Sequence, residues 1–502
     1  MQKLLRQILT SRVYEAAVET PLDHASALSL ELGNQIFLKR EDLQPVFSFK
    51  LRGAYNCIAH LNDEQLKAGV ITASAGNHAQ GVAFSARHLG VPATIVMPAT
   101  TPEIKVEAVR ALGAEVLLHG DNYSEAKDYC DHVVSERGMT FIHPFDDELV
   151  IAGQGTIGDE IVRQTSGQLS AVFIPVGGGG LAAGVGAFIK ALCPEVLVFG
   201  VEPYDSDAMA RSLEAGERVC LESVGIFADG VAVREVGERT FALCREVLDG
   251  VVRVSTDEIC SAIKAIYQAT RTIVEPAGAL GLAGMRSYLR EHRLQGQKLV
   301  AITSGANMNF ERLRYVGERT LIGEKREALF AVTIPEKPGA LRVLCEQVLG
   351  TRSITEFNYR LADRSAAYIF VGMSIDGDSE RTALSSQMQS LGYQVLDLTD
   401  NELAKTHVRY MVGGRSQAAS REYLYRFWFP ERPGALARFL AAMGASWNIS
   451  LFHYRTQGGE FGRVLIGLEI PPGEEPRLRG FLDSLGYRYV DETNNDAYRL
   501  FL

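Results

Sequence analysis

The last third of the chain repeats itself, and this repeat constrains the fold more than any other feature. The stretch ALFAVTIPEKPGAL at 328–341 matches YLYRFWFPERPGAL at 423–436, with an offset of 95 residues. A second match joins LGYQVLDLTDN at 391–401 to LGYRYVDETNN at 485–495. Each copy reads strand, Pro-Gly turn, helix, strand, strand, helix, strand, which predicts a small ferredoxin-like α+β domain.

The residues before the repeat follow a different pattern. Short apolar runs such as GVITAS at 69–74 alternate with segments of helical periodicity such as GNHAQGVAFSARHLG at 76–90. This alternation is typical of an α/β fold with a largely parallel sheet, in which ligands bind where strands end. We therefore expect an α/β domain at 1–321. Two repeat domains should follow, at 328–400 and 423–494, with a linker between them at 407–422.

Composition excludes several classes of protein. The net charge of −10 gives no basic excess for binding nucleic acid. The seven cysteines are scattered without a CxxC pair, which argues against a disulfide framework or a structural zinc site and fits a reducing cytoplasm. The N-terminus lacks the apolar core of a signal peptide, and no window is long and apolar enough to span a membrane.

Three glycine-containing turns follow apolar runs, at 74–78 (SAGNH), 177–181 (GGGGL) and 304–307 (SGAN). Four consecutive glycines between a strand and a helix let the backbone and the helix N-terminus approach an anion, so GGGGL predicts a phosphate cradle. The alternative interpretation is a flexible loop. No GK[ST] follows this turn and its own glycines do not form a GxGxxG, so the turn is neither a P-loop nor a dinucleotide fingerprint.

Lys50 lies in the apolar stretch VFSFKLRGA. It is either a lysine whose stem covers apolar surface or a desolvated nucleophile for a carbonyl compound. Asn77 offers an amide for a ring oxygen, and Ser304 is either a helix cap or a hydroxyl for a ligand nitrogen. His78 has no partner at i+4 and suits packing or orientation better than metal binding. A carbonyl, a phosphate, a ring oxygen and a ring nitrogen occur together in pyridoxal 5′-phosphate.

The motifs SFKLRGA, SAGNHAQG, GGGGLAAG, EPAGALGLAG and SGAN stand in an order that resembles the fold type II (tryptophan synthase β-like) pyridoxal-phosphate enzymes. Within them the chain is similar to the biosynthetic threonine deaminases (threonine ammonia-lyases), and TEFNYR and NISLFHYR extend the similarity into the repeats. The resemblance implies an α/β catalytic domain followed by two α+β ferredoxin-like, ACT-like regulatory domains.

The implied reaction is β-elimination of water from L-threonine, giving 2-oxobutanoate and ammonia, the committed step of isoleucine biosynthesis, with L-serine as a secondary substrate. By resemblance, Lys50 forms the internal Schiff base and removes the Cα proton. The implied cofactor contacts are Lys50, Phe49, Asn77, Gly177, Gly178, Gly179, Gly180, Leu181 and Ser304. The implied substrate-carboxylate loop is Ser74, Ala75, Gly76, Asn77 and His78.

The sequence departs from related serine racemases at two places. At the position of Ala75, those enzymes carry a serine that acts as a base on the far face of Cα. Because this chain has no hydroxyl there, we expect racemisation to be disfavoured. The serine racemases also bind a divalent cation through a glutamate and a second acid. Glu202 matches the glutamate, whereas Ala208 stands at the position of the second acid, and the nearest carboxylate is Asp207, one residue earlier. We expect no metal, although a cation at Glu202 and Asp207 stays open. Other functions considered are a serine-preferring dehydratase, a β-replacement enzyme and an amino-acid-binding regulator built on an inactive enzyme.

Pattern alone leaves the repeats as either a structural, dimerising unit or an effector sensor. Resemblance implies feedback inhibition by isoleucine, relief by valine and a homotetramer. The Pro-Gly turns offer backbone N–H groups for a carboxylate. The aromatic residues expected near an effector are Phe357, Tyr359, Phe452 and Tyr454.

Overall fold

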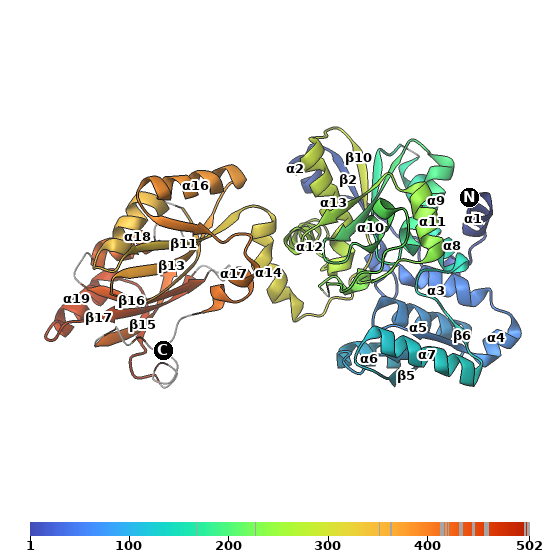
Figure 1. Ribbon diagram of the computed structural model, residues 1–502, viewed down its shortest axis with the longest axis horizontal. Coiled ribbons are helices and arrows are strands. Elements are labelled where there is room, and N and C mark those ends of the chain that lie inside the picture. Colours follow the sequence, from blue (N-terminus) through green and yellow to red (C-terminus); the bar gives the residue numbers. More distant parts are fainter. Residues whose placement is uncertain are drawn as a thin grey trace. The chain divides into compact units, whose positions relative to one another are not determined.

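The computed structural model describes residues 1–502 except 167, 226, 351, 362–363, 412–415, 417–418, 420, 431–434, 444–446, 456–460, 496–497 and 499–502. The chain forms two compact units, Met1–Thr320 and Leu321–Leu502 (Figure 1). In the part of the chain so described, no helix has the length and apolarity needed to cross a bilayer.

The first unit is built on a six-stranded sheet with strand order β1-β2-β10-β7-β8-β9. All neighbours are parallel except β1, which runs antiparallel to β2. The strands are β1 (Leu22–His24), β2 (Gln35–Arg40), β7 (Ala171–Pro175), β8 (Leu197–Pro203), β9 (Gly250–Val254) and β10 (Lys298–Thr303). The central strands are buried on both faces, as expected for continuous apolar runs in a parallel sheet.

A smaller, fully parallel sheet of order β5-β4-β3-β6 forms a second lobe of this unit. Its strands are β3 (Val70–Ala73), β4 (Ala93–Met97), β5 (Glu115–Leu118) and β6 (Thr140–Phe141). Figure 1 shows α3 between this lobe and the six-stranded sheet, where it packs on α5 and α8. The helices around the small sheet and at its border are α3 (Lys50–Ala59), α4 (Asp63–Ala68), α5 (Asn77–Leu89), α6 (Glu103–Arg110) and α7 (Tyr123–Arg137).

The remaining helices of the first unit belong to the larger sheet, where they bury apolar residues on its faces. They are α1 (Gln2–Leu9), α2 (Ser26–Leu32), α8 (Glu148–Thr165), α9 (Gly180–Leu192), α10 (Ala208–Ala215), α11 (Glu238–Val247), α12 (Thr256–Thr270) and α13 (Pro276–His292). Short helical turns lie at Val13–Glu15 (η1), Glu41–Leu43 (η2) and Asp229–Val231 (η3). Helix α14 (Arg312–Gly323) leads into the second unit.

The second unit contains both repeats in one eight-stranded antiparallel sheet of order β14-β11-β13-β12-β16-β17-β15-β18. The first copy gives β11 (Glu327–Pro335), α15 (Ala340–Leu344) with the turn η4 (Cys345–Leu349), β12 (Ile354–Arg360), β13 (Ala366–Ser374), α16 (Asp378–Ser390) and β14 (Gln394–Asp397). The second gives β15 (Glu422–Pro430), α18 (Ala435–Met443), β16 (Asn448–Arg455), β17 (Phe461–Glu469), α19 (Glu475–Leu485) and β18 (Tyr489–Asp491). The predicted α/β and ferredoxin-like α+β folds are both confirmed.

The two copies join through β12 and β16, whose register places Phe357 opposite Tyr454 and Tyr359 opposite Phe452. One apolar core runs through both copies. Between them lie α17 (Glu402–Thr406) and the turn η5 (Val408–Tyr410), while much of the expected linker falls outside the described residues. The Pro-Gly turn of the first copy has Gly339 at φ 84°, and that of the second copy also lies outside them.

Candidate active site

Lys50 is the first residue of α3, and the residues before it are fixed by the segment that follows β10. Phe49 N donates to Ser304 O at 3.2 Å, and Ala306 N donates to Phe47 O at 2.9 Å. Phe47 has φ 54°, a left-handed value that is rare for an aromatic residue. These backbone contacts bring Lys50 and Ser304 together from positions more than 250 residues apart.

The Lys50 side chain is partly buried, and its Nζ donates to Pro144 O at 2.8 Å. Its ammonium lies 5.4 Å from the centroid of the Phe49 ring. Within the described part of the chain it makes no ion pair, so desolvation is unopposed and lowers the pKa of Lys50 to about 8. A larger fraction of the nucleophilic amine is therefore present near neutral pH than for an ordinary lysine.

Asn77, within the SAGNH stretch, is the first residue of α5, and both ends of its amide form hydrogen bonds. Its Nδ2 donates to Glu275 Oε1 at 2.6 Å, and its Oδ1 accepts from Asn307 Nδ2 at 2.7 Å. These two bonds fix which way the amide points and leave one N–H of Nδ2 for a ligand. Glu275 and Asn307 were not identified as site residues from the sequence, although both lie in the quoted motifs EPAGALGLAG and SGAN.

Glu275 is a buried carboxyl at the start of α13. Burial, reinforced by the charge of Asp229, raises its pKa to about 7. A side chain on Gly305 would meet the carboxyl, since its Cβ would lie 2.4 Å from Glu275 Oε1. The glycine of SGAN is therefore needed for Glu275 to reach Asn77.

His78 is buried beside this cluster, and its Nε2 lies 2.9 Å from Ile142 O. A carbonyl only accepts, so Nε2 carries the proton and Nδ1 is unprotonated. Burial and the nearby Lys50 charge lower the His78 pKa to about 3. Among the described residues Nδ1 has no hydrogen-bond partner, so it can accept a bond from a ligand. The neighbouring Ser74 Oγ accepts from Gly76 N at 3.3 Å, and the space beside Gly76 is open.

The glycine loop joins β7 to α9 in tight surroundings. A Cβ on Gly178 would lie 2.2 Å from the Phe145 ring, and one on Gly177 would lie 2.9 Å from Val231 Cα. Gly179 has φ 94° and stands directly before α9, which begins at Gly180. Only glycines fit this enclosed turn, so their steric surroundings account for them without a flexible loop. Because the turn lies at a helix N-terminus, it suits a phosphate group. Phe145, which closes the loop, was missed because nothing in the sequence near it marks a site.

Ser304 directly follows β10 and is buried, and its hydroxyl donates to Ala277 O at 3.2 Å. No helix begins at Ser304, since the next one, α14, starts at Arg312. The helix-cap interpretation is therefore wrong. A buried hydroxyl beside the Lys50 segment is a suitable partner for a ring nitrogen.

The possible cation residues have other partners. Glu202 accepts from Met209 N and Ala210 N at 3.0 and 2.9 Å, and burial raises its pKa to about 8. Asp207 pairs with Arg211 at 2.8 Å and with Arg253 at 3.1 Å. In the residues that the structure describes, no three metal-ligating side chains gather.

Two cavities in the second unit are formed between the repeats. The first is lined by residues that include Leu349, Arg352, Ile354, Phe429, Phe452 and Tyr454, and the second by residues that include Glu336, Tyr359, Ile369, Met443, Trp447 and Asn448. They correspond under the 95-residue offset, which relates Tyr359 to Tyr454 and Arg352 to Trp447. Phe357 lines neither cavity and packs edge-on against Phe452, with ring centroids 5.0 Å apart.

Comparison with known proteins agrees with this geometry. Residues 13–305 match the profile of pyridoxal-phosphate dependent enzymes, and residues 318–408 and 413–502 match the C-terminal regulatory domain of threonine dehydratase. The chain is 57% identical over 501 residues to the L-threonine dehydratase biosynthetic IlvA of Burkholderia multivorans, covering 99% of each chain. It is 54% identical over 499 residues to the Escherichia coli protein of the same name, covering 99% of this chain and 96% of that one.

Among solved structures, the processed form of threonine deaminase isoform 2 from Solanum lycopersicum matches with a TM-score of 0.62 and 52% identity. That match covers 63% of this chain and 92% of the other. The glycine cradle and the desolvated Lys50 both fit pyridoxal phosphate. The chain therefore belongs to the pyridoxal-phosphate-dependent enzymes and, among them, to the threonine dehydratases that carry a C-terminal regulatory domain.

Proposed function

We propose that this chain deaminates L-threonine by β-elimination of water, giving 2-oxobutanoate and ammonia in the committed step of isoleucine biosynthesis, and accepts L-serine as a secondary substrate. The observation that carries the proposal is Lys50, whose amine has a pKa lowered to about 8 beside the residues that suit the cofactor. The full-length similarity to proteins named L-threonine dehydratase supports the choice of substrate.

When bound, pyridoxal 5′-phosphate withdraws electrons from the substrate Cα and so makes its proton acidic. Lys50 would hold the cofactor's aldehyde carbon, Phe49 would pack beside it, and Asn77 would donate its free amide N–H to the ring oxygen. Ser304 would face the ring nitrogen, and a hydroxyl there need not protonate the ring. The phosphate would be held by the loop Gly177, Gly178, Gly179, Gly180 and Leu181.

In the proposed reaction Lys50 Nζ removes the Cα proton, a role that suits an amine with a pKa near the working pH. The loop Ser74, Ala75, Gly76, Asn77 and His78 would hold the substrate carboxylate through hydroxyl and backbone N–H groups. The β-hydroxyl leaves as water with one proton, which balances the proton that Lys50 removes from Cα. The released enamine tautomerises to the imine, and one water hydrolyses it to the oxo acid and ammonia. Ala75 offers no hydroxyl to return a proton to the far face of Cα.

The test is to assay the purified protein for 2-oxobutanoate from L-threonine and to compare kcat/KM for threonine and serine. We expect threonine to be preferred, and Lys50→Ala to lose activity by several orders of magnitude, because nucleophile and base disappear together. Near-normal turnover in Lys50→Ala would contradict the role of Lys50. A kcat/KM that favours serine would instead identify a serine dehydratase, and efficient use of sulfide would identify a β-replacement enzyme.

We further propose that the catalytic domain spans 1–321 and that the domains at 328–400 and 423–494, joined by the linker 407–422, bind isoleucine as inhibitor and valine as its antagonist. The two cavities between the repeats suit these ligands, because aliphatic and aromatic residues line them together with polar groups such as Arg352 and Asn448. Tyr359, Phe452 and Tyr454 would contact the effectors, and Phe357 would act by supporting Phe452. We expect a cytoplasmic homotetramer.

A further inference from the structure

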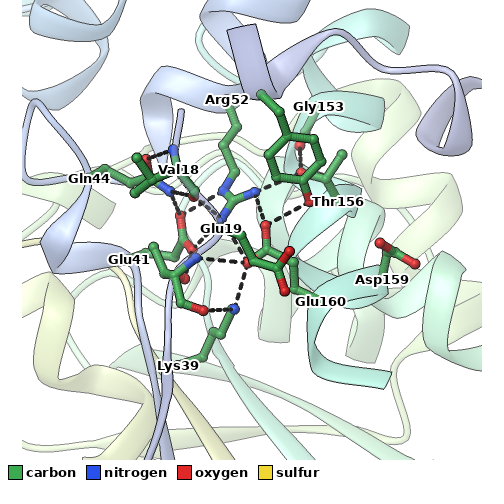
Figure 2. Close-up of polar contacts among 12 residues, drawn as sticks. Val18, Glu19, Lys39, Glu41, Gln44, Arg52, Gly153, Thr156, Asp159 and Glu160 are labelled. Atoms are coloured by element: carbon green, nitrogen blue, oxygen red, sulfur yellow. Dashed lines mark hydrogen bonds and ion pairs between the residues drawn. The ribbon is translucent and has the colours of Figure 1, made fainter. Parts of the chain in front are cut away.

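A network of buried charged side chains lies on the side of α3 opposite to Lys50. Figure 2 shows Arg52 of α3 between the carboxylates of Glu41 and Glu160, with Lys39 bound to Glu160 on the other side. All four side chains have 0% exposure. The network joins four elements, because Arg52 lies on α3, Lys39 lies on β2, Glu41 begins η2 and Glu160 lies on α8.

Every nitrogen of the Arg52 guanidinium has an acceptor. Nε and Nη2 donate to Glu41 at 2.8 and 2.7 Å, and Nη1 and Nη2 donate to Glu160 at 2.6 and 3.0 Å. Nη1 also donates to Thr156 Oγ1 at 3.1 Å, and Nη2 to Val18 O at 3.2 Å. Two forked pairs therefore hold the guanidinium plane in one orientation.

The network carries no net charge, since two cations balance two carboxylates. Burial alone would raise the pKa of Glu160, but the Arg52 guanidinium and the Lys39 ammonium lower it, so the carboxylate is charged. Lys39 Nζ lies 2.5 Å from Glu160 Oε2 and donates to Thr20 O at 2.6 Å. Because the four charges cancel, the network adds no net charge behind Lys50.

Lys50 and Arg52 lie in the same turn of α3 and point to opposite sides, as residues two apart on a helix do. Lys50 extends to Pro144 O, while Arg52 extends to Glu41 of η2 and Glu160 of α8. On the α8 side the two helices touch backbone to backbone, because a Cβ on Gly153 would lie 2.7 Å from Arg52 O. The first turn of α3 is thus held by two forked ion pairs and by a glycine contact.

Stability does not explain this arrangement, because apolar residues of similar volume often stabilise a protein as well as a buried ion pair does. What a forked guanidinium provides is a defined direction. We propose that Arg52, Glu41 and Glu160 form a positioning clamp that fixes the first turn of α3 and so directs Lys50 Nζ toward the substrate Cα. The proposal rests on the proposed role of Lys50.

The test compares Arg52→Met/Glu41→Gln with the parent protein. This double variant removes one cation and one anion, so it keeps the charge balance, leaves the Lys39–Glu160 pair and loses both forks. We expect an unchanged thermal midpoint, a kcat lower by about 100-fold and a KM within about threefold of the parent value, as for a displacement of about 1 Å. Cofactor-free variant mixed with pyridoxal 5′-phosphate should also develop its visible absorbance at least about tenfold more slowly.

The matched control is Arg40→Met/Asp42→Asn, which removes a pair of similar burial (5% and 0% exposed) from the same segment of chain. It should keep the parent kcat and the parent rate of cofactor attachment. If it loses both as the test variant does, the effect is general loss of packing and the clamp is refuted. A test variant with parent-like kcat and attachment rate also refutes it.

If the double variant does not fold, Tyr14→Phe tests the clamp instead. This change removes only the hydrogen bond from the Tyr14 hydroxyl to Glu160, at 2.7 Å, and Tyr14 is 47% exposed. It should lower kcat by a few-fold with an unchanged midpoint, and an unchanged kcat refutes the clamp. Borohydride reduction of the parent, followed by mass analysis of the Lys50 peptide, separates the two proposals. Absence of cofactor on Lys50 there overturns the proposed function itself.

Discussion

Burial shifts the pKa values of Lys50, His78 and Glu275 in the directions that favour their uncharged forms. It lowers that of Lys50 to about 8 and that of His78 to about 3, and it raises that of Glu275 to about 7. Near neutral pH an amine, an imidazole and a carboxyl can therefore all occur uncharged at one site. Such a site can move a proton without first stripping water from an ion.

The lowered pKa of Lys50 predicts how cofactor attachment depends on pH. In cofactor-free protein the rate of attachment should rise about tenfold per pH unit up to about pH 8 and then level, because only the neutral amine reacts. Stopped-flow absorbance measures the attachment rate at each pH. The same measurement with N-acetyl-lysine amide in place of the protein corrects for the titration of pyridoxal 5′-phosphate itself. A midpoint at or above pH 10 would show that Lys50 is not desolvated.

Ala75 predicts the stereochemical outcome of the reaction. The unmodified chain should form little D-serine from L-serine, and Ala75→Ser should raise D-serine formation measurably, because it supplies a hydroxyl on the far face of Cα. Chiral chromatography of the product measures this, and Ala75→Val controls for side-chain size. Racemisation by the unmodified chain at the rate of dehydration would refute the argument.

The residues predicted from the sequence are those that local motifs mark, and the residues missed are those that act through distant contacts. Lys50, Asn77 and the glycines each stand in a short, recognisable stretch. Glu275 reaches Asn77 across 198 positions of sequence, so its role depends on the fold. The only local signal for it is a lone acid before a helix-starting proline in an apolar, glycine-rich segment.

At the scale of elements, the pattern of each repeat predicted its strands and helices, but the way the copies join was not predictable. An edge strand carries unpaired N–H and C=O groups, and pairing β12 with β16 satisfies them while making one continuous sheet. The alternation of apolar residues fixes which face of each strand is buried, but it does not fix which edge meets another copy.

The contact between α3 and α8 predicts the effect of a single methyl group. Gly153→Ala should destabilise the catalytic unit by about 1–3 kcal/mol, because its Cβ would lie 2.7 Å from Arg52 O and 2.8 Å from Gly53 Cα, and backbone cannot yield as a side chain does. It should also lower kcat, since α3 carries Lys50. Calorimetry and threonine assays measure both effects.

Gly317→Ala is the matched control for that change. Gly317 lies in α14 with no atom near its Cβ position, so alanine there should leave stability unchanged or raise it by up to about 1 kcal/mol through helix propensity. Equal destabilisation by the two substitutions would mean that the close approach of α3 and α8 has no special role.

At the scale of the whole molecule, the chain divides after Thr320, within α14. Arg319 of this helix pairs with Asp257 of α12, so most of α14 is held by the catalytic unit. The catalytic unit has its own sheets and its own cores and is large enough to fold by itself. The described contacts of Lys50 come from its own unit, and residues 318–408 and 413–502 match the C-terminal regulatory domain of threonine dehydratase.

This division predicts the behaviour of a shortened chain that ends at Gly323 and keeps the whole of α14. It should deaminate threonine with a hyperbolic saturation curve and no response to isoleucine, because the cavities between the repeats are gone. In the full chain, isoleucine should make the curve sigmoidal and valine should reverse this, with a coupling free energy of about 1–3 kcal/mol between effector and substrate. Tyr454→Ala in the full chain controls for the loss of mass, because it should weaken the effector response while the rest of the second unit remains. Inhibition of the shortened chain by isoleucine at the same concentration would place the effector site in the catalytic unit instead.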